Sequence, residues 1–305
     1  MRLTWRSALG TIIACVALFF IVRSLRSSLG ELGSYRFAIS PWRIGGAFAV
    51  FVLLFPIYGA VWQYITRKFG YPLSFAKSTR IWLLSQAGRY VPGKVWFALG
   101  RIYLAEREGV PKSVTTVAMA LELALVLGSS VLVFGLATYI RGSLAGHPYA
   151  WSLGLVPLIV IGVHPRIVKA VLARLGKGHG EFKMSYLDIL KLLVIYVVCW
   201  CIYGVGFYLI GTSLVVTGTA AGPHSVLTAR LLPEMIGINA LAWTVGFVSV
   251  ITPAGLGIRE GVATFLLLSL LDKPYPSLIP LVARVWVTVA EVGAIGLVLM
   301  LRTRR

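Results

Sequence analysis

Long apolar stretches with almost no charge dominate the chain. A membrane-spanning helix needs about 20 mainly apolar residues, and six stretches reach or approach that length. Their only charged residues are Glu122, Arg284 and Glu291. We therefore expect six full transmembrane helices. They cover Ser7–Val22, Ile44–Thr66, Ser113–Ile140, Gly142–Val163, Leu192–Thr217 and Leu278–Leu301.

Two further apolar stretches are interrupted near the middle. Ile81–Tyr103 is broken at Gly88–Lys94, and Met235–Leu271 is broken at Thr252–Glu260. Proline and glycine interrupt helical hydrogen bonding, and irregular backbone at membrane depth must be buried in protein or line a cavity. We expect two re-entrant helix pairs, and two kinked full spans in each stretch are the alternative. The residues predicted to break the helices are Pro92, Gly93, Pro253, Gly255 and Gly257.

The two halves of the chain follow one pattern. Each has a clean span, a broken stretch, and a last span that a proline opens. Pro111 precedes Glu122 by the same number of residues as Pro280 precedes Glu291. We predict an all-α polytopic membrane protein whose residues 1–305 form one transmembrane domain. Residues 44–140 and 192–301 would be inverted repeats within it, as in many secondary transporters.

The composition excludes a water-soluble protein. Apolar residues make up 58% of the 305 residues, and charged residues make up 13%. Typical soluble domains have about 45–50% apolar and about 25% charged residues. The mean hydropathy is +0.86, so the polar surface is too small to cover a soluble globule.

The net charge is +19. We attribute this excess of basic residues to the cytoplasmic loops of a membrane protein, and we expect no nucleic acid as a partner. Lys and Arg concentrate in the cytoplasmic loops of membrane proteins. With both broken stretches re-entrant, most basic residues fall on the side that holds both termini and loop 164–191. We expect a multi-pass cell-membrane protein with cytoplasmic termini. Arg23–Arg43, which is basic and lies on the outer side, is the exception.

Cationic residues near the breaks are the candidates for substrate binding. Arg89 and Lys94 flank the first break, and Arg101 lies two helical turns after Lys94. With a helix N-terminus they would suit an anion such as phosphate; alternatively, their side chains snorkel toward lipid headgroups. Arg259 would be a second cationic binding site for the anion. Alternatively, Arg259 would pair with Glu260 and only stabilise the hairpin.

Two glutamates lie within predicted spans and need a proton or a cationic partner. For Glu122 we expect Arg89 or Lys94 as that partner. For Glu291 we expect Arg284, seven residues earlier, or Arg259. A role in coupling or binding and a purely structural ion pair both remain open.

Signatures of catalysis are absent from the sequence. There is no nucleotide-binding glycine-rich loop and no Cys/His cluster with metal-ligand spacing. The four histidines lie singly in predicted loops. We expect no enzymatic activity, no cofactor and no metal. The 9 Trp and 13 Tyr residues are assigned mostly to aromatic belts at the membrane surfaces.

Two motifs resemble the lysylphosphatidylglycerol synthase transmembrane (flippase-like) family. The first is Gln86–Trp96, which contains Arg89-Tyr90-Val91-Pro92-Gly93-Lys94, followed by Gly100-Arg101 and by Glu122 in the next span. The second is Thr252–Glu260. The resemblance covers nearly the whole chain, and no synthase domain is expected. It implies translocation of an anionic, phosphate-bearing lipid, either a polyprenyl-phosphate sugar or an aminoacyl-phospholipid, and it places Tyr90 beside the substrate.

Two other functions compete with lipid translocation. One is an intramembrane enzyme that acts on lipid phosphate, which the absence of paired acids or a nucleophile–base set disfavours. The other is a non-transporting membrane subunit that works with a separate glycosyltransferase or synthase. In all three cases the bilayer and a phosphate-bearing lipid are the expected partners.

Overall fold

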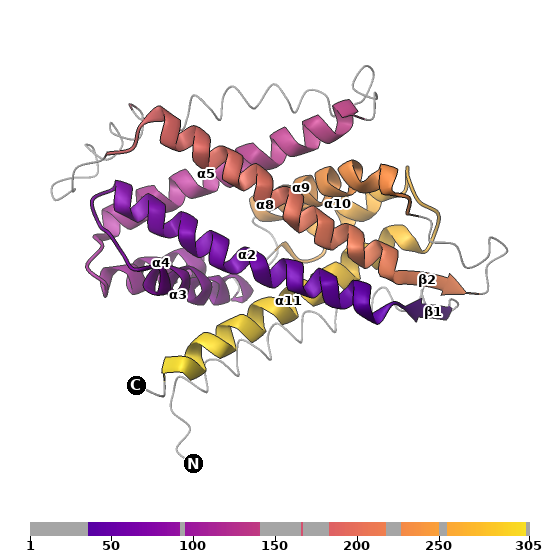
Figure 1. Ribbon diagram of the computed structural model, residues 1–305, viewed down its shortest axis with the longest axis horizontal. Coiled ribbons are helices and arrows are strands. Elements are labelled where there is room, and N and C mark those ends of the chain that lie inside the picture. Colours follow the sequence, from indigo (N-terminus) through magenta and orange to yellow (C-terminus); the bar gives the residue numbers. More distant parts are fainter. Residues whose placement is uncertain are drawn as a thin grey trace, which may run out of the picture.

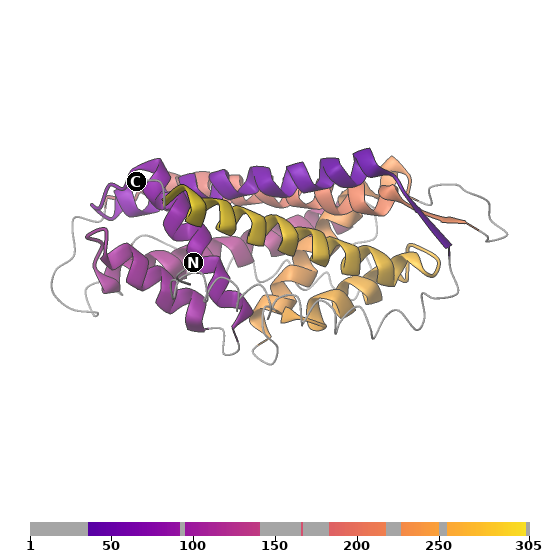
Figure 2. The ribbon, with the colours of Figure 1, turned by 90° about the horizontal axis from the view of Figure 1, so that it is seen from below.

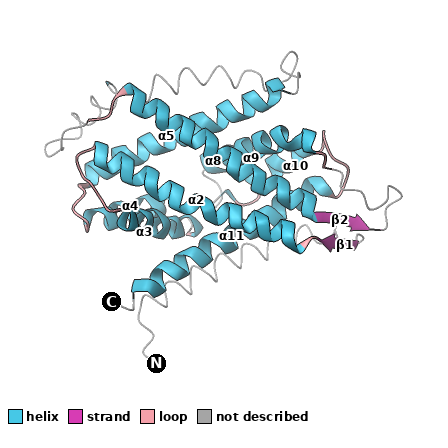
Figure 3. Ribbon diagram, viewed as in Figure 1, coloured by secondary structure: helices cyan, strands magenta, loops and turns pink. Residues whose placement is uncertain are grey.

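The computed structural model describes residues 36–91, 95–140, 166, 183–217, 227–249 and 255–302. Nearly all of this part is helical (Figure 3). Two predicted spans, Ser7–Val22 and Gly142–Val163, lie outside the described residues. The same holds for Pro92, Gly93, Lys94 and Pro253.

Eight α-helices, two short strands and two 3-10 turns make up the described chain. In chain order these are β1 (Arg36–Ile39), α2 (Pro41–Lys68), α3 (Phe75–Gln86), η1 (Ala87–Tyr90), α4 (Val95–Glu106), α5 (Lys112–Ile140), α8 (Tyr186–Ser213), β2 (Leu214–Thr217), η3 (Ala229–Leu231), α9 (Leu232–Val248), α10 (Ile258–Leu267) and α11 (Tyr275–Arg302).

Five helical segments of the described chain are long and apolar enough to cross a membrane. Four of them, in α2, α5, α8 and α11, coincide with predicted spans. The fifth, Ala229–Val248, was expected to be one limb of a broken stretch that begins at Met235. It starts earlier and reaches 20 residues, because Pro233 stands at its first turn, where a missing N–H costs nothing.

The end of one predicted span is a strand. Leu214–Thr217 was expected to continue a helix, but it forms β2 and pairs antiparallel with β1. Two adjacent β-branched residues, Val215 and Val216, favour the extended conformation there. Ser40 N donates to Ser213 O at 2.8 Å and joins the two helices at the base of this ribbon.

Helices α2 and α8 pack side by side and antiparallel along the length of the molecule (Figure 1). At one end the ribbon β1–β2 ties them together. At the other end Lys68 Nζ lies 2.9 Å from Asp188 Oδ2, and Lys183 N donates to Lys68 O at 2.8 Å. Asp188 also accepts from Ser185 N and closes a capping box at the start of α8. Both ends of the pair are therefore fixed.

Helices α3 and α4 form a hairpin that returns to the end where it starts. Each has 12 residues, about 18 Å, against about 30 Å of membrane hydrocarbon. Lys77 Nζ, in the first turn of α3, lies 2.7 Å from Glu108 Oε2, just after α4. The first broken stretch thus consists of two short limbs joined near the middle of the molecule.

A second hairpin, α9–α10, occupies the opposite end of the long axis (Figure 2). Its turn contains Gly255 and Gly257, both with positive φ (71° and 83°). Leu227, just before η3, and Ile279, near the start of α11, both face Gly211 at the end of α8. The chain therefore enters α9 and leaves α10 at the same end.

Glycines let the helices approach closely. A Cβ on Gly204 of α8 would lie 2.5 Å from Ile236 Cα of α9, and a Cβ on Gly237 would lie 2.8 Å from Ala137 Cβ of α5. Gly59 of α2 lies against Thr79 of α3 in the same way. Small residues at helix contacts are the usual means of packing helices in lipid.

Gly204→Ala tests this packing. The added methyl group meets backbone, so we expect a loss of about 1–3 kcal/mol in the free energy of unfolding and a lower melting temperature in detergent. Gly45→Ala in α2 is the control, because a Cβ there meets nothing within 4 Å. Equal melting temperatures for the two variants would contradict the close contact of α8 and α9.

Candidate functional site

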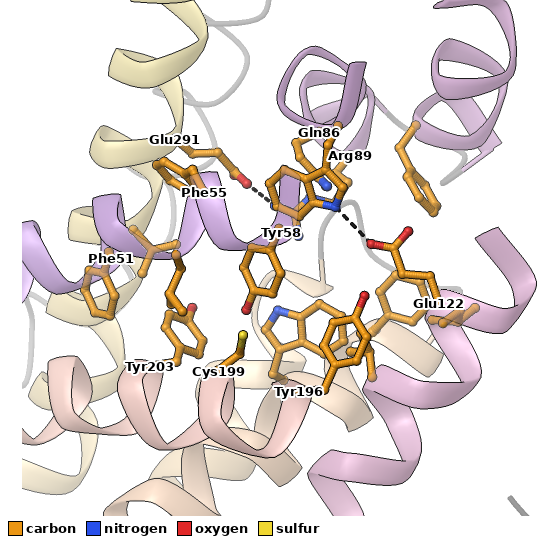
Figure 4. A pocket seen from close by; sticks show the side chains of 18 of the residues that line it. Phe51, Phe55, Tyr58, Gln86, Arg89, Glu122, Tyr196, Cys199, Tyr203 and Glu291 are labelled. Atoms are coloured by element: carbon orange, nitrogen blue, oxygen red, sulfur yellow. Dashed lines mark hydrogen bonds and ion pairs between the residues drawn. The ribbon is translucent and has the colours of Figure 1, made fainter. Parts of the chain in front are cut away.

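A cavity lies where the two hairpins face α2, α5, α8 and α11 (Figure 4). All eight described helices and η1 contribute to its wall, and its space measures about 1490 Å³, including the part open to the surroundings. Its charged residues are Arg89, Arg101, Arg259, Arg284, Glu122 and Glu291. All six are predicted site residues, and the structure brings them to one place.

Arg101 and Glu122 form a buried ion pair between α4 and α5. Trp82 Nε1 donates to Glu122 Oε1 at 2.9 Å, and Arg101 Nε donates to Ser85 Oγ at 3.0 Å. The Arg101 guanidinium also lies 4.9 Å from the ring centroid of Trp62. Arg101 is 2% exposed, so it does not snorkel toward headgroups.

The expected partner of Glu122 was therefore wrong. Arg89 or Lys94 was predicted; Arg101 takes that place, Arg89 pairs with Glu291, and Lys94 lies outside the described residues. Helix α4 returns antiparallel to α3 and packs on α5, which brings its middle, rather than the break, beside Glu122. Arg101 was predicted to bind substrate, but in the structure its charge is neutralised by Glu122.

Arg89 pairs with Glu291 across the two halves of the chain. Arg89 lies in η1, directly after α3, and Glu291 lies in α11. Tyr90 OH donates to Glu291 Oε2 at 2.5 Å. The prediction that Arg284 or Arg259 pairs with Glu291 was wrong. Arg284 is seven residues away on the same helix, about 10 Å along the axis, whereas η1 reaches Glu291 from the other half.

Arg284 faces α10. Its Nε lies 3.8 Å from Glu260 Oε1, while Glu260 Oε2 accepts from Gly257 N at 2.7 Å and caps α10. Glu260, which was predicted near the site, reaches the cavity only through Arg284. It does not pair with its neighbour Arg259, because successive helical residues point about 100° apart.

Arg259 has neutral partners. Its Nη2 donates to Tyr203 OH at 2.7 Å and to Asn239 Oδ1 at 3.2 Å, and its guanidinium lies 5.4 Å from the Tyr203 ring centroid. The residue is 8% exposed. A Cβ on Gly246 would lie 2.8 Å from Arg259 Cβ, so this glycine of α9 leaves the room that Arg259 occupies.

Aromatic side chains make up much of the remaining wall. Tyr58 and Trp82 stack with ring centroids 4.8 Å apart, and Trp243 and Phe247 stack at 5.1 Å. Trp200 packs edge-on against Trp243 at 5.5 Å. Most Trp and Tyr residues are predicted to form interfacial belts, and these cavity residues are exceptions. Tyr58, Trp200 and Trp243 lie inside apolar stretches rather than at their ends, and this position is the signal that would have revealed them; Trp82 lies at the start of its stretch and gives no such signal.

The first break is closely packed where the structure describes it. A Cβ on Gly88 would clash with the backbone of Trp96 and Phe97, at the start of α4. Arg89 follows at the C-terminal end of α3 and η1, where the helix dipole favours a cation. The turn thus places Arg89 on the cavity side of the break, with its side chain 23% exposed.

The donor set of the described residues does not suggest a metal. They contain no cluster of three His, Cys, Asp or Glu side chains that could hold one.

No protein-family model and no curated protein matches the chain. The arrangement can bind and neutralise an anion between guanidinium groups and aromatic rings.

A double-mutant cycle tests the Arg101–Glu122 pair. Glu122→Met or Arg101→Met alone leaves an opposite charge buried, so each should lower the free energy of unfolding by about 3–5 kcal/mol. The double variant should recover most of that loss, because both charges are then gone. Equilibrium unfolding in detergent measures all four proteins. Additive losses in the double variant would show that the two side chains do not interact.

Proposed function

We propose that this multi-pass membrane protein carries an anionic, phosphate-bearing lipid across the membrane. The observation that carries the proposal is the cavity itself, in which four arginines from both halves of the chain surround a space walled by aromatic rings. Buried charge at membrane depth is costly and is typical of a substrate pathway. Guanidinium groups bind phosphate oxygens through paired, charge-assisted hydrogen bonds.

The cavity addresses the physical problem that such a lipid presents. Its headgroup cannot enter hydrocarbon without losing its hydration, whereas its acyl or prenyl tail can remain in the bilayer. In the cavity, arginine and tyrosine donors replace the water around the phosphate. No nucleotide-binding motif occurs in the sequence, so translocation would follow a lipid or ion gradient.

Residues 44–140 and 192–301 are proposed as inverted repeats. Helices α2, α3, α4 and α5 would correspond to α8, α9, α10 and α11. The packing supports this assignment, because α2 packs on α3 as α8 packs on α9, and α4 packs on α5 as α10 packs on α11. The antiparallel pair α2–α8 would then lie on the pseudo-twofold axis, with the cavity between the repeats.

The distribution of basic residues supports a cytoplasmic location for the end where α2 and α11 finish. Helix ends and loops on that side carry more Lys and Arg than those on the side of the β-ribbon. The former are Arg67, Lys68, Lys77, Arg80, Arg107, Lys112, Lys183, Lys191 and Arg302. The latter are Arg36, Arg43, Arg230 and Lys273. Both termini of a cell-membrane protein would then be cytoplasmic.

The Arg89–Glu291 pair is proposed as the contact that changes during transport. It joins the first hairpin to α11 and therefore bridges the two proposed repeats. A phosphate that reaches Arg89 competes with Glu291 for the same donors. Glu291 would then lose its counterion and take up a proton, which would link lipid binding to proton movement. The Arg101–Glu122 pair lies within one repeat and would keep its geometry.

The resemblance to the flippase-like family supports the same proposal through Arg89, Tyr90 and Glu122. An intramembrane lipid-phosphate enzyme is the alternative, and a subunit of a glycosyltransferase or synthase system is another. Of these, only translocation gives a role to opposed arginines from both halves without a nucleophile or base. Polyprenyl-phosphate sugars and aminoacyl-phospholipids are the two proposed substrate classes.

Reconstituted liposomes test the proposal directly. Proteoliposomes that contain a fluorescent polyprenyl-phosphate sugar or aminoacyl-phospholipid should expose it to an outer-leaflet quencher faster than empty liposomes. Arg89→Gln should slow this at least about tenfold, since it removes a charge-assisted phosphate contact worth about 1.5–3 kcal/mol. Lys112→Gln is the control, because Lys112 is an exposed cation paired with Glu106 outside the cavity.

Two other outcomes would separate the competing functions. Chemical conversion of the lipid would indicate the enzyme, and activity only after addition of a transferase would indicate the subunit. Full transport by Arg89→Gln would remove Arg89 from the pathway.

Cysteine labelling tests whether the cavity is wet and cationic. Leu123 lines it, so Leu123→Cys in a background with Cys15, Cys199 and Cys201 replaced by Ser should react with methanethiosulfonates. Each labelling rate is divided by the rate of the same reagent with a small free thiol in solution. The normalised rate should be higher for an anionic reagent than for a cationic one, because the arginines attract the anion. Adding Arg284→Gln should reduce that preference. A preference for the cationic reagent would contradict a cationic cavity.

A further inference from the structure

We infer that the headgroup carried in this cavity bears one negative charge and is otherwise uncharged. This describes a lipid phosphodiester with a hydroxyl-rich remainder, and the inference rests on the proposed function. It distinguishes this substrate class from lipid diphosphates, which carry more negative charge, and from aminoacyl lipids, which carry an ammonium group. The charge balance of the cavity and the position of Arg259 lead to it.

Three of the four cavity arginines already face a carboxylate. Arg101 pairs with Glu122, Arg89 pairs with Glu291, and Arg284 faces Glu260. Arg259 differs, since its hydrogen bonds in the described part of the chain go to a phenol and an amide oxygen. The cavity therefore has one guanidinium charge that no described carboxylate balances.

Arg259 retains donors for an anion. Both of its hydrogen bonds come from Nη2, and its Nε and Nη1 groups carry further N–H donors. Asn239, which is 2% exposed, has a buried Nδ2 with no acceptor among the described residues. In a medium of low dielectric constant, an unbalanced buried cation favours a counterion. A phosphate at Arg259 would supply that counterion with a single negative charge.

A second negative charge would lack such a partner. To bind in the arrangement that the structure shows, it would have to displace Glu122, Glu291 or Glu260 from its arginine, and the displaced buried carboxylate would then have to take up a proton. Both cavity carboxylates also accept a second hydrogen bond, Glu122 from Trp82 and Glu291 from Tyr90. A lipid diphosphate should therefore bind less tightly than a phosphodiester.

An ammonium group would find no described cavity carboxylate without a counterion. Both cavity carboxylates already pair with arginines, so the ammonium group would compete with a guanidinium for each of them, and several aromatic rings beside the cavity already face a guanidinium. Arg101 lies over Trp62 and Trp82, and Arg259 lies over Tyr203. The remaining stacked rings, Trp243 and Phe247, offer apolar surfaces that suit the C–H faces of a sugar or polyol. A glycerophospholipid with a polyol headgroup and a prenyl phosphosugar share this chemistry.

Binding of short-chain lipids to the purified protein in detergent tests the inference by titration calorimetry. The probes are dihexanoyl-phosphatidylglycerol, farnesyl phosphoglucose, farnesyl diphosphate and dihexanoyl-lysylphosphatidylglycerol. We expect one or both of the first two to bind at least about tenfold more tightly than the last two. A difference between the first two identifies the lipid source. Tighter binding of the diphosphate or the lysyl lipid would overturn the inference.

Two variants connect the preference to named charges. Arg259→Gln should weaken phosphodiester binding about tenfold or more, and Arg259→Lys, which keeps the charge, should recover part of it. Glu260→Gln keeps an oxygen for the helix cap but removes the charge facing Arg284, so diphosphate binding should rise relative to phosphodiester binding. Unchanged diphosphate preference in Glu260→Gln, or unchanged binding in Arg259→Gln, would contradict the charge count.

Transport of the same four lipids in proteoliposomes separates the two proposals. If lysylphosphatidylglycerol binds best and is translocated, the charge inference fails while the proposed function stands. If a phosphodiester binds at Arg259 but no lipid is translocated, the proposed function fails and the charge inference stands.

Discussion

A guanidinium group buried inside a protein needs a counterion, and this requirement organises the centre of the molecule. Arg101 meets it within one hairpin and its following span, through Glu122. Arg89 meets it across the molecule, through Glu291. Because breaking a buried pair costs several kcal/mol, these contacts determine how the first hairpin is seated between α5 and α11.

The broken helices make these contacts possible. A continuous helix would carry its charges past the middle of the molecule on one face, whereas a hairpin of two short limbs places its turn there. The ends of α2 and α8 are tied by the β1–β2 ribbon and by Lys68 and Asp188. Hairpins packed on this antiparallel pair from opposite ends bring their turns to the same depth. Residues distant in sequence, such as Arg89 and Arg259, thus line one space.

Sequence periodicity and composition were sufficient for the coarse fold but not for the pairings. Four predicted spans correspond to helices because a run of about 20 apolar residues can be recognised within one continuous segment of the sequence, without knowing what packs against it. The breaks follow from glycine and proline, as the positive φ of Gly255 and Gly257 illustrates. The partners of Glu122 and Glu291 were mispredicted because spacing along one helix says nothing about which other helix packs there. Trp82 was missed because it lies at the start of its apolar stretch, where an aromatic residue at the membrane surface is expected.

The position of Arg259 shows how a local rule of helix formation shapes the site. Helix α10 begins after Gly257, whose N–H needs an acceptor, and Glu260 supplies it from the third helical position. That carboxylate also faces Arg284, so it is directed away from its sequence neighbour. Gly246 then lets Arg259 approach α9, where Tyr203 and Asn239 offer oxygen atoms without charge. Helix capping and close packing together therefore leave a cation facing the cavity, because the nearest carboxylate is already needed to start the helix.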